Sequence, residues 1–207
     1  LPLPMACAMQ VCVILGLCCE HRSWSLVQPV NGGVSGSVEC FLKPDLPLNW
    51  LQPEWPAPAY VRAVMTGRHG GVSLAPYDSM NLGDHVGDLP ANVQCNRAVL
   101  QAALGRRPVF LQQVHGVEAL TLDADMPDGL PADACMASTS DVACTIMVAD
   151  CLPVLLCDTA GRWVAAAHAG WRGLAGQGGQ GVLETLVSSL PQSQSEGAEI
   201  LAWLGPC

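Results

Sequence analysis

Two histidines and one cysteine stand where predicted β-strands end, and side chains of these types can bind a metal or act as catalysts. They are His115, Cys151 and His168. Strand ends gather at one rim of a sheet, so we expect these side chains to converge although they are far apart in the sequence.

Imidazole and thiolate are typical zinc ligands, and three protein ligands leave a fourth position open for water or substrate. The residues alone leave two other interpretations open. Cys151 is a candidate nucleophile, activated by His115 or His168. Alternatively, all three residues have only structural roles.

Other polar residues are candidates for proton transfer and anion binding. Asp150 precedes the cysteine and is a candidate general base, a partner of a metal ligand, or a solvated turn residue. Arg172 is a candidate anion clamp, and Arg68 lies in a glycine-rich turn whose backbone N–H groups can approach an anion. Asn81 and His85 are further polar candidates, with loop capping as the alternative.

Apolar segments predict the elements that position these side chains. Segments 142–149, 152–157 and 163–167 are apolar throughout, which is typical of strands buried on both faces. Further strands are predicted at 60–66, 109–114, 118–122 and 200–204, with 109–114 and 118–122 forming a hairpin. Helices are predicted at 90–104 and 182–190. These elements predict a mixed α and β fold with a buried sheet core.

Composition excludes several classes of protein. The chain has 207 residues, and 9 Lys and Arg against 18 Asp and Glu give a net charge of −9. This charge argues against a dedicated binder of nucleic acid or anionic membranes. A membrane-spanning helix needs about 18 consecutive apolar residues, and no apolar run in the sequence is that long. The 11 cysteines form no paired Cys-x-x-Cys motifs, which argues against a zinc finger and favours a reduced, intracellular protein, with a disulfide framework as the alternative.

The first 50 residues show no sustained helical or strand periodicity. We expect residues 1–50 to be a non-native or disordered extension and residues 51–207 to form the folded domain. A cleaved targeting segment is the alternative, because Val11–Leu17 is a short apolar run.

Five segments in a fixed order resemble a known family. They are TGRHGGVS at 66–73, PYDSMNLGDHVGD at 76–88, LQQVHG at 111–116, ADCLPVLLCD at 149–158 and AHAGWRG at 167–173. Together they resemble the multicopper polyphenol oxidase or laccase-domain family, whose members are now regarded as purine nucleoside phosphorylases.

The resemblance implies an α+β fold, a layered α/β/β/α sandwich of the laccase-domain, cysteine-hydrolase-like type. It implies that His115, Cys151 and His168 hold Zn²⁺, with Cu²⁺ as the alternative metal. The implied activity is phosphorolysis of adenosine, inosine, guanosine and 5′-methylthioadenosine in the cytoplasm, together with deamination of adenosine. The implied partners are therefore purine nucleosides and phosphate.

Site residues follow from the same resemblance. Asp150 and the three metal ligands are predicted to be catalytic. Substrate or phosphate binding is predicted for Arg68, Ser73, Asn81, His85 and Arg172.

Two departures from the family pattern affect these expectations. Segment 174–184 reads LAGQGGQGVLE, in which QGGQ is additional. The chain also stops shortly after the last predicted strand, which predicts a domain truncated at its C-terminus. The alternatives are an inactive metal-binding fragment and a copper-dependent polyphenol oxidase. The oxidase is disfavoured because multicopper sites need many histidines and the chain has 5.

Overall fold

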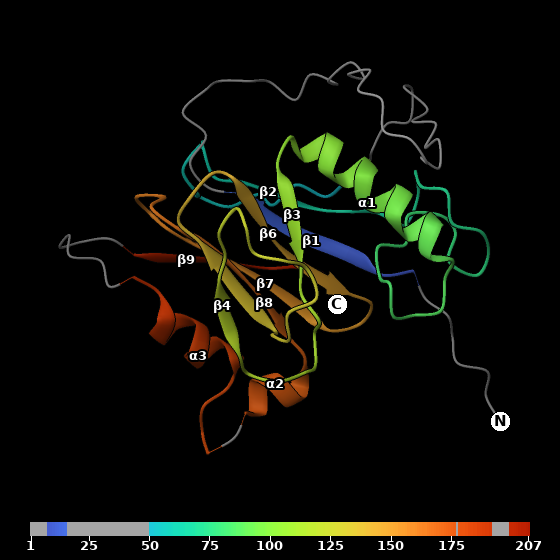
Figure 1. Ribbon diagram of the computed structural model, residues 1–207. Coiled ribbons are helices and arrows are strands. Elements are labelled where there is room, and N and C mark those ends of the chain that lie inside the picture. Colours follow the sequence, from blue (N-terminus) through green and yellow to red (C-terminus); the bar gives the residue numbers. More distant parts are fainter. Residues whose placement is uncertain (1–7, 16–49, 177, 192–198) are drawn as a thin grey trace.

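The computed structural model describes residues 8–15, 50–176, 178–191 and 199–207 (Figure 1). The first sheet contains β1 (Gln10–Leu15), β2 (Arg62–Met65), β3 (Arg107–Phe110) and β6 (Val142–Val148). The second contains β4 (Ala119–Thr121), β5 (Ala134–Ala137), β7 (Leu152–Asp158), β8 (Val164–Ala169) and β9 (Ile200–Leu204). The helices are α1 (Pro90–Leu104), α2 (Trp171–Ala175) and α3 (Val182–Ser189).

The sheets differ in how their strands pair. In the first sheet, with the order β2-β1-β6-β3, β1 is antiparallel to both neighbours and β3 is parallel to β6. In the second, with the order β4-β5-β8-β7-β9, only β4 and β5 are parallel. The antiparallel pairing of β7 and β8 brings the start of one strand beside the end of the other.

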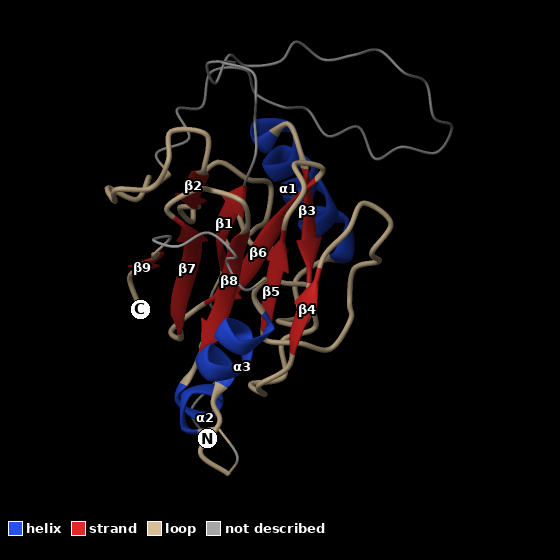
Figure 2. Ribbon diagram, turned by 90° about the vertical axis from the view of Figure 1, so that its left-hand side faces the viewer, coloured by secondary structure: helices blue, strands red, loops and turns tan. Residues whose placement is uncertain are grey.

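The core lies between the two sheets, and each sheet also has a buried outer face. In β6, Cys144 and Ile146 point into the core between the sheets, whereas Ala143 and Met147 pack on the side that carries α1. On the other side, α3 packs against β4, β5 and β8. Helices α1 and α3 therefore lie on opposite sides of the paired sheets (Figures 1 and 2). The predicted layered α/β/β/α sandwich is confirmed.

Local sequence signals explain the two longer helices. Helix α1 begins at Pro90, whose missing N–H costs nothing at a first helical position, and ends at Leu104, after which Gly105 has a φ of 63°. Helix α3 begins after Gly181, whose backbone N–H donates to the Glu184 carboxylate at 3.0 Å. Its first residue, Val182, is fully buried, so the start of α3 packs against the sheet. No helix in the described part of the chain is long and apolar enough to cross a membrane.

Two predictions about strands differ from the structure. The predicted hairpin between 109–114 and 118–122 is wrong, because β3 and β4 belong to different sheets and β4 pairs in parallel with β5. The chain crosses between the sheets after β3, so neighbours in sequence are not neighbours in a ladder. Strand β5 itself was not predicted.

The N-terminal segment also differs from expectation at one place. Strand β1 lies between β2 and β6, inside the first sheet, although we expected no folded structure before residue 51. Val11 and Val13 pack on the α1 side, and Cys12 and Ile14 pack between the sheets. A strand buried on both faces has no polar alternation, which explains why its period was not recognised. Residues 1–7 and 16–49 lie outside the described residues.

Candidate metal centre

Strand pairing brings the two predicted ligands of the second sheet together. Cys151 immediately precedes β7, and His168 lies near the end of β8, where it is paired with Pro153. His115 comes from the segment that crosses from β3 to β4. The three available ligand atoms lie within 4.8 Å of one another.

The cluster of three side chains is exposed to solvent on one side. The Cys151 Sγ lies 3.9 Å from the His115 Nε2, and the two imidazole rings meet edge to face with centroids 4.7 Å apart. His168 is buried, Cys151 is half-buried and His115 is exposed. A small molecule can therefore reach the cluster from the His115 side.

These residues fit a transition-metal ion by donor type and spacing. Neighbouring ligand atoms in a tetrahedral zinc site lie about 3.5 Å apart, so the three atoms, which lie within 4.8 Å of one another here, would draw closer around a bound ion. Space around the cluster is also limited, because a Cβ added at Gly170 would lie 2.9 Å from the Cys151 Sγ and 3.3 Å from the His115 Cδ2. The structure thus leaves room for the three ligand side chains only because residue 170 is glycine.

Asp133 holds the buried histidine and was not predicted from the sequence. Its Oδ1 lies 2.8 Å from the His168 Nδ1, and the Asp133 side chain is fully buried. Burial alone raises the pKa of Asp133, but hydrogen bonds from His168 and from the backbone of Gly116, Val114 and His115 bring this pKa below its usual value. Asp133 is therefore ionised and accepts a hydrogen bond from the His168 Nδ1–H. The Nε2 of His168 is then the nitrogen that is free to bind a metal.

The thiol of Cys151 has an environment that opposes ionisation without a cation. Burial, followed by the carboxylate of Asp150, raises the pKa of Cys151. Asp150 is exposed and directly precedes Cys151. A metal ion held by these residues would supply the positive charge that a thiolate needs here.

The predicted substrate residues lie in different environments. Ser73 and Asn81 are buried, and their side chains bind Asp88 at 2.6 and 2.9 Å. The Ser73 Oγ also accepts from Asn96, and the Asn81 amide is further bonded to Met9 and Gly83. These two side chains therefore hold the loop after β2 together, instead of presenting free groups to a phosphate.

The remaining predicted residues are exposed. The Arg68 Nε donates to the Asp78 carbonyl at 2.9 Å, and the His85 Nδ1 lies 3.5 Å from the Asp84 Oδ1. Arg172 is exposed one residue after Trp171, and its guanidinium lies 5.3 Å from the centre of the indole ring. Of these three, only Arg172 is close in sequence to a residue that touches the cluster, Gly170.

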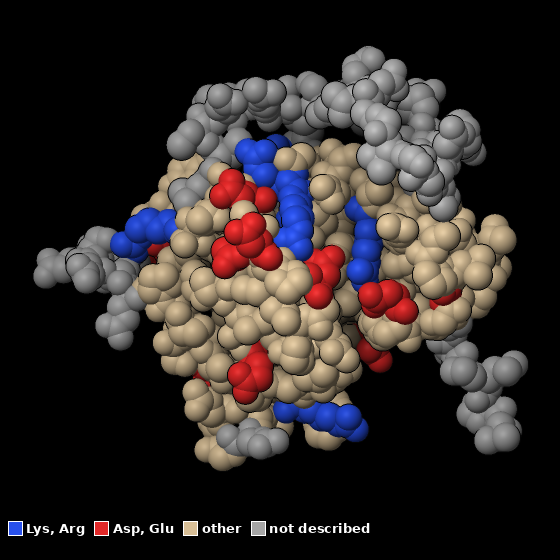
Figure 3. Space-filling view, in the orientation of Figure 1, with Lys and Arg blue, Asp and Glu red and all other residues tan. Residues whose placement is uncertain are grey.

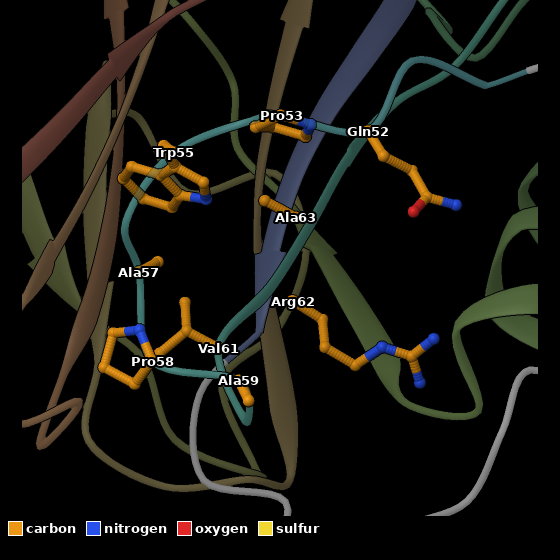
Figure 4. A pocket seen from close by; sticks show the side chains of 9 residues that line it. All are labelled: Gln52, Pro53, Trp55, Ala57, Pro58, Ala59, Val61, Arg62 and Ala63. Atoms are coloured by element: carbon orange, nitrogen blue, oxygen red, sulfur yellow. The ribbon is translucent and has the colours of Figure 1, made fainter.

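Two surface features are separate from the metal centre. A cavity of about 260 Å³ is lined by residues of the 52–63 segment, including Trp55 and Arg62 but none of the predicted site residues (Figure 4). On the face shown in Figure 3, basic side chains are interspersed with acidic ones, so the described residues form no broad basic surface there.

Comparison with known proteins places these features in a family. Residues 62–207 match the family described as multi-copper polyphenol oxidoreductase laccase. The chain is 56% identical over 157 residues to a protein of Pseudomonas aeruginosa named purine nucleoside phosphorylase PA4543, covering 76% of this chain and 61% of that one. It is 51% identical over 158 residues to the purine nucleoside phosphorylase YfiH of Escherichia coli K12, covering 75% and 62%.

Solved structures agree. The Neisseria meningitidis protein NMB0706 matches with a TM-score of 0.69 and 46% identity, covering 76% of this chain and 62% of that chain. YlmD of Geobacillus stearothermophilus matches with a TM-score of 0.63 and 30% identity, over the same shares. The chain thus spans about three-fifths of the length of these relatives. The family resemblance is confirmed, and the chain belongs to the multi-copper polyphenol oxidoreductase laccase family.

Proposed function

We propose that this chain carries the metal centre of a zinc-dependent purine nucleoside phosphorylase. The observation that carries the proposal is the convergence of His115, Cys151 and His168 within 4.8 Å, with one side open to solvent. The names of relatives at 56% and 51% identity support the reaction class. The proposed substrates are adenosine, inosine, guanosine and 5′-methylthioadenosine, each with phosphate, and the proposed location is the cytoplasm.

In the proposed reaction a phosphate oxygen forms a bond to C1′ of the nucleoside, and the bond from C1′ to the purine nitrogen breaks. The electron pair of that bond passes to the purine nitrogen, which takes up the proton that the hydrogen phosphate loses when its oxygen bonds to C1′. Zinc, when bound by the three ligands, would supply a Lewis acid at the open side of the cluster. Cys151 and the two imidazoles orient the substrate relative to that side because the sheet fixes their positions.

Asp150 and Arg172 are the residues we assign to proton and phosphate handling. The Asp150 carboxylate is exposed beside Cys151, so it can hold the proton that the leaving purine takes up. Arg172 is exposed, follows His168 by four residues, and can pair with phosphate oxygens through its planar guanidinium. Trp171 presents its ring to solvent, with 74% exposure, and offers a flat surface for the purine. Arg68 and His85 stay predictions as further phosphate ligands.

The same site is proposed to deaminate adenosine. Here water adds to C6 of the adenine ring and ammonia leaves, which gives inosine. The step needs a group that moves a proton from the water to the leaving nitrogen. We assign this transfer to Asp150, because it is an exposed carboxylate that directly precedes Cys151.

Chromatography of the products from adenosine tests both reactions. The zinc-loaded protein is incubated with adenosine, with and without phosphate. Adenine that appears only with phosphate supports phosphorolysis, and inosine in both samples supports deamination. Zinc bound at one equivalent without either product would refute the activity and leave a metal-binding protein. Oxidation of a phenol by the copper-loaded protein would favour the polyphenol oxidase.

A pair of cysteine variants provides the control. Cys151→Ser removes the thiolate ligand and is expected to abolish zinc binding and both products. Cys157→Ser changes a free thiol near the other end of β7 from Cys151 and is expected to leave them unchanged. Equal activity in the two variants would contradict a role for the metal centre.

A further inference from the structure

Asp133 is hydrogen-bonded to two of the three ligands and to the backbone on either side of His115. Its Oδ1 accepts from the His168 Nδ1 at 2.8 Å and from the His115 N–H at 2.9 Å. Its Oδ2 accepts from the N–H groups of Gly116 at 2.7 Å and Val114 at 3.1 Å. The Asp133 carbonyl also accepts from the His168 N–H at 2.7 Å.

The turn that carries His115 has the shape of an anion-binding nest. Three consecutive N–H groups, at residues 114–116, point toward one carboxylate. His115 itself has a φ of 58°, the left-handed region that a residue with a Cβ rarely adopts. Because an unfilled nest would leave these N–H groups without partners, the buried Asp133 carboxylate stabilises the backbone conformation that aims His115 at the cluster.

On the β8 side, the same carboxylate fixes the imidazole of His168. An ionised carboxylate accepts only, so Nδ1 must carry the proton and Nε2 keeps its lone pair. His168 is 4% exposed, and water therefore competes little for the Nδ1 proton. The ring is held in the tautomer that a metal needs before any metal arrives.

We propose that Asp133 is the positioning residue of the metal centre, and that it couples His115 and His168 so that both ligands are preset for one ion. The proposal rests on the metal-binding part of the proposed function and is independent of the reaction catalysed. It differs from a purely structural role because it predicts effects on metal affinity and on the His168 tautomer that fold stability alone does not produce.

Asp133→Asn tests the coupling with little change in volume. Each carboxylate oxygen of Asp133 accepts two hydrogen bonds. In either orientation of the asparagine amide, an NH₂ group replaces one of these oxygens, and it cannot accept the two hydrogen bonds made there. We expect the zinc dissociation constant, measured by chelator competition without nucleoside, to rise by about 10- to 100-fold. We also expect the cobalt-substituted variant to show altered ligand-field and thiolate charge-transfer absorption, because the geometry of the ligands changes.

The matched control is Asp158→Asn. Asp158 is a buried carboxylate at the far end of β7 that accepts from the Arg162 backbone N–H and Nε, both at 2.6 Å. Unfolding of both metal-free variants in urea measures the loss of stability. The proposal predicts that only Asp133→Asn weakens zinc binding. Equal zinc affinity in wild-type protein and Asp133→Asn would overturn it.

A measurement on wild-type protein covers the case in which Asp133→Asn does not fold. Nitrogen-15 NMR of the metal-free protein reports which ring nitrogen of His168 is protonated. The proposal predicts a proton on the Nδ1 of His168, and a proton on Nε2 alone would overturn it. The proposal would also be overturned if the wild-type protein bound no zinc. A wild-type chain that binds zinc but releases no adenine would refute the phosphorylase instead and leave the role of Asp133 standing.

Discussion

Replacing Gly170 with alanine should damage the metal centre without disturbing the backbone. Gly170 precedes α2 with a φ of −66° and a ψ of 158°, an extended conformation that alanine adopts freely. The added Cβ would nevertheless stand 2.9 Å from the Cys151 Sγ. The consequence of Gly170→Ala is therefore a contact problem at the ligand, with no backbone strain.

The size of the effect follows from that distance. Non-bonded atoms approach to about 3.5 Å, so the sulfur or the new methyl group must move by at least about 0.6 Å. Metal–ligand distances tolerate only about 0.2 Å. Overpacking of this kind costs about 1–3 kcal/mol. If the metal-bound form bears that cost, the zinc dissociation constant rises by about 5- to 150-fold.

Chelator competition with the metal-free proteins measures this change, and Gly116→Ala is the matched control. Gly116 is also next to a ligand, but its added Cβ would meet only Val114 and Asp133, at 3.4 and 3.5 Å, which is ordinary contact. We expect Gly116→Ala to bind zinc like the wild type. A wild-type zinc affinity in Gly170→Ala, with the control unchanged, would refute the proposed position of the Cys151 thiolate.

Three further predictions concern the loop after β2 and the phosphate. Asn96→Ala should lower the free energy of unfolding by at least about 2 kcal/mol in urea, because the fully buried Asn96 amide bonds Ser73 and several backbone groups that would lose their partner. Burial alone raises the pKa of Asp88, but hydrogen bonds from Ser73 and Asn81 bring this pKa below its usual value. The ionised Asp88 therefore stabilises the folded protein fully above about pH 4, and this contribution is lost as the pH falls through the lower pKa of the folded state. Asp88→Asn should make the acid limb of a stability profile shallower, and an unchanged limb would contradict this. Arg172→Ala should raise the KM for phosphate by about 10- to 100-fold while zinc stoichiometry stays the same, and an unchanged KM would exclude Arg172 from phosphate binding.

Elements with local signals were predictable from the sequence, whereas their partners were not. Helix α1 has the predicted bounds because Pro90 and Gly105 act on the adjacent backbone. Strand β4 was placed in the right region but assigned to the wrong partner, since pairing with β5 depends on where the chain crosses between sheets. Strand β1 lacked alternation because both of its faces are buried.

The candidate site divides in the same way. His115, Cys151 and His168 were identifiable because each stands at a strand end and has a side chain that binds metals. Asp133 left no comparable signal, since it is one acidic residue before a short strand. Only the fold reveals that its carboxylate faces both the His115 turn and the His168 ring.

The central claim is that one zinc ion held by His115, Cys151 and His168 is required for phosphorolysis. The most direct test adds zinc stepwise to the metal-free protein and measures bound zinc and the initial rate of ribose 1-phosphate formation from inosine and phosphate in the same samples. The account predicts that both rise together and level off at one equivalent of zinc. A full rate in the metal-free protein, or bound zinc at one equivalent with no ribose 1-phosphate, would contradict it.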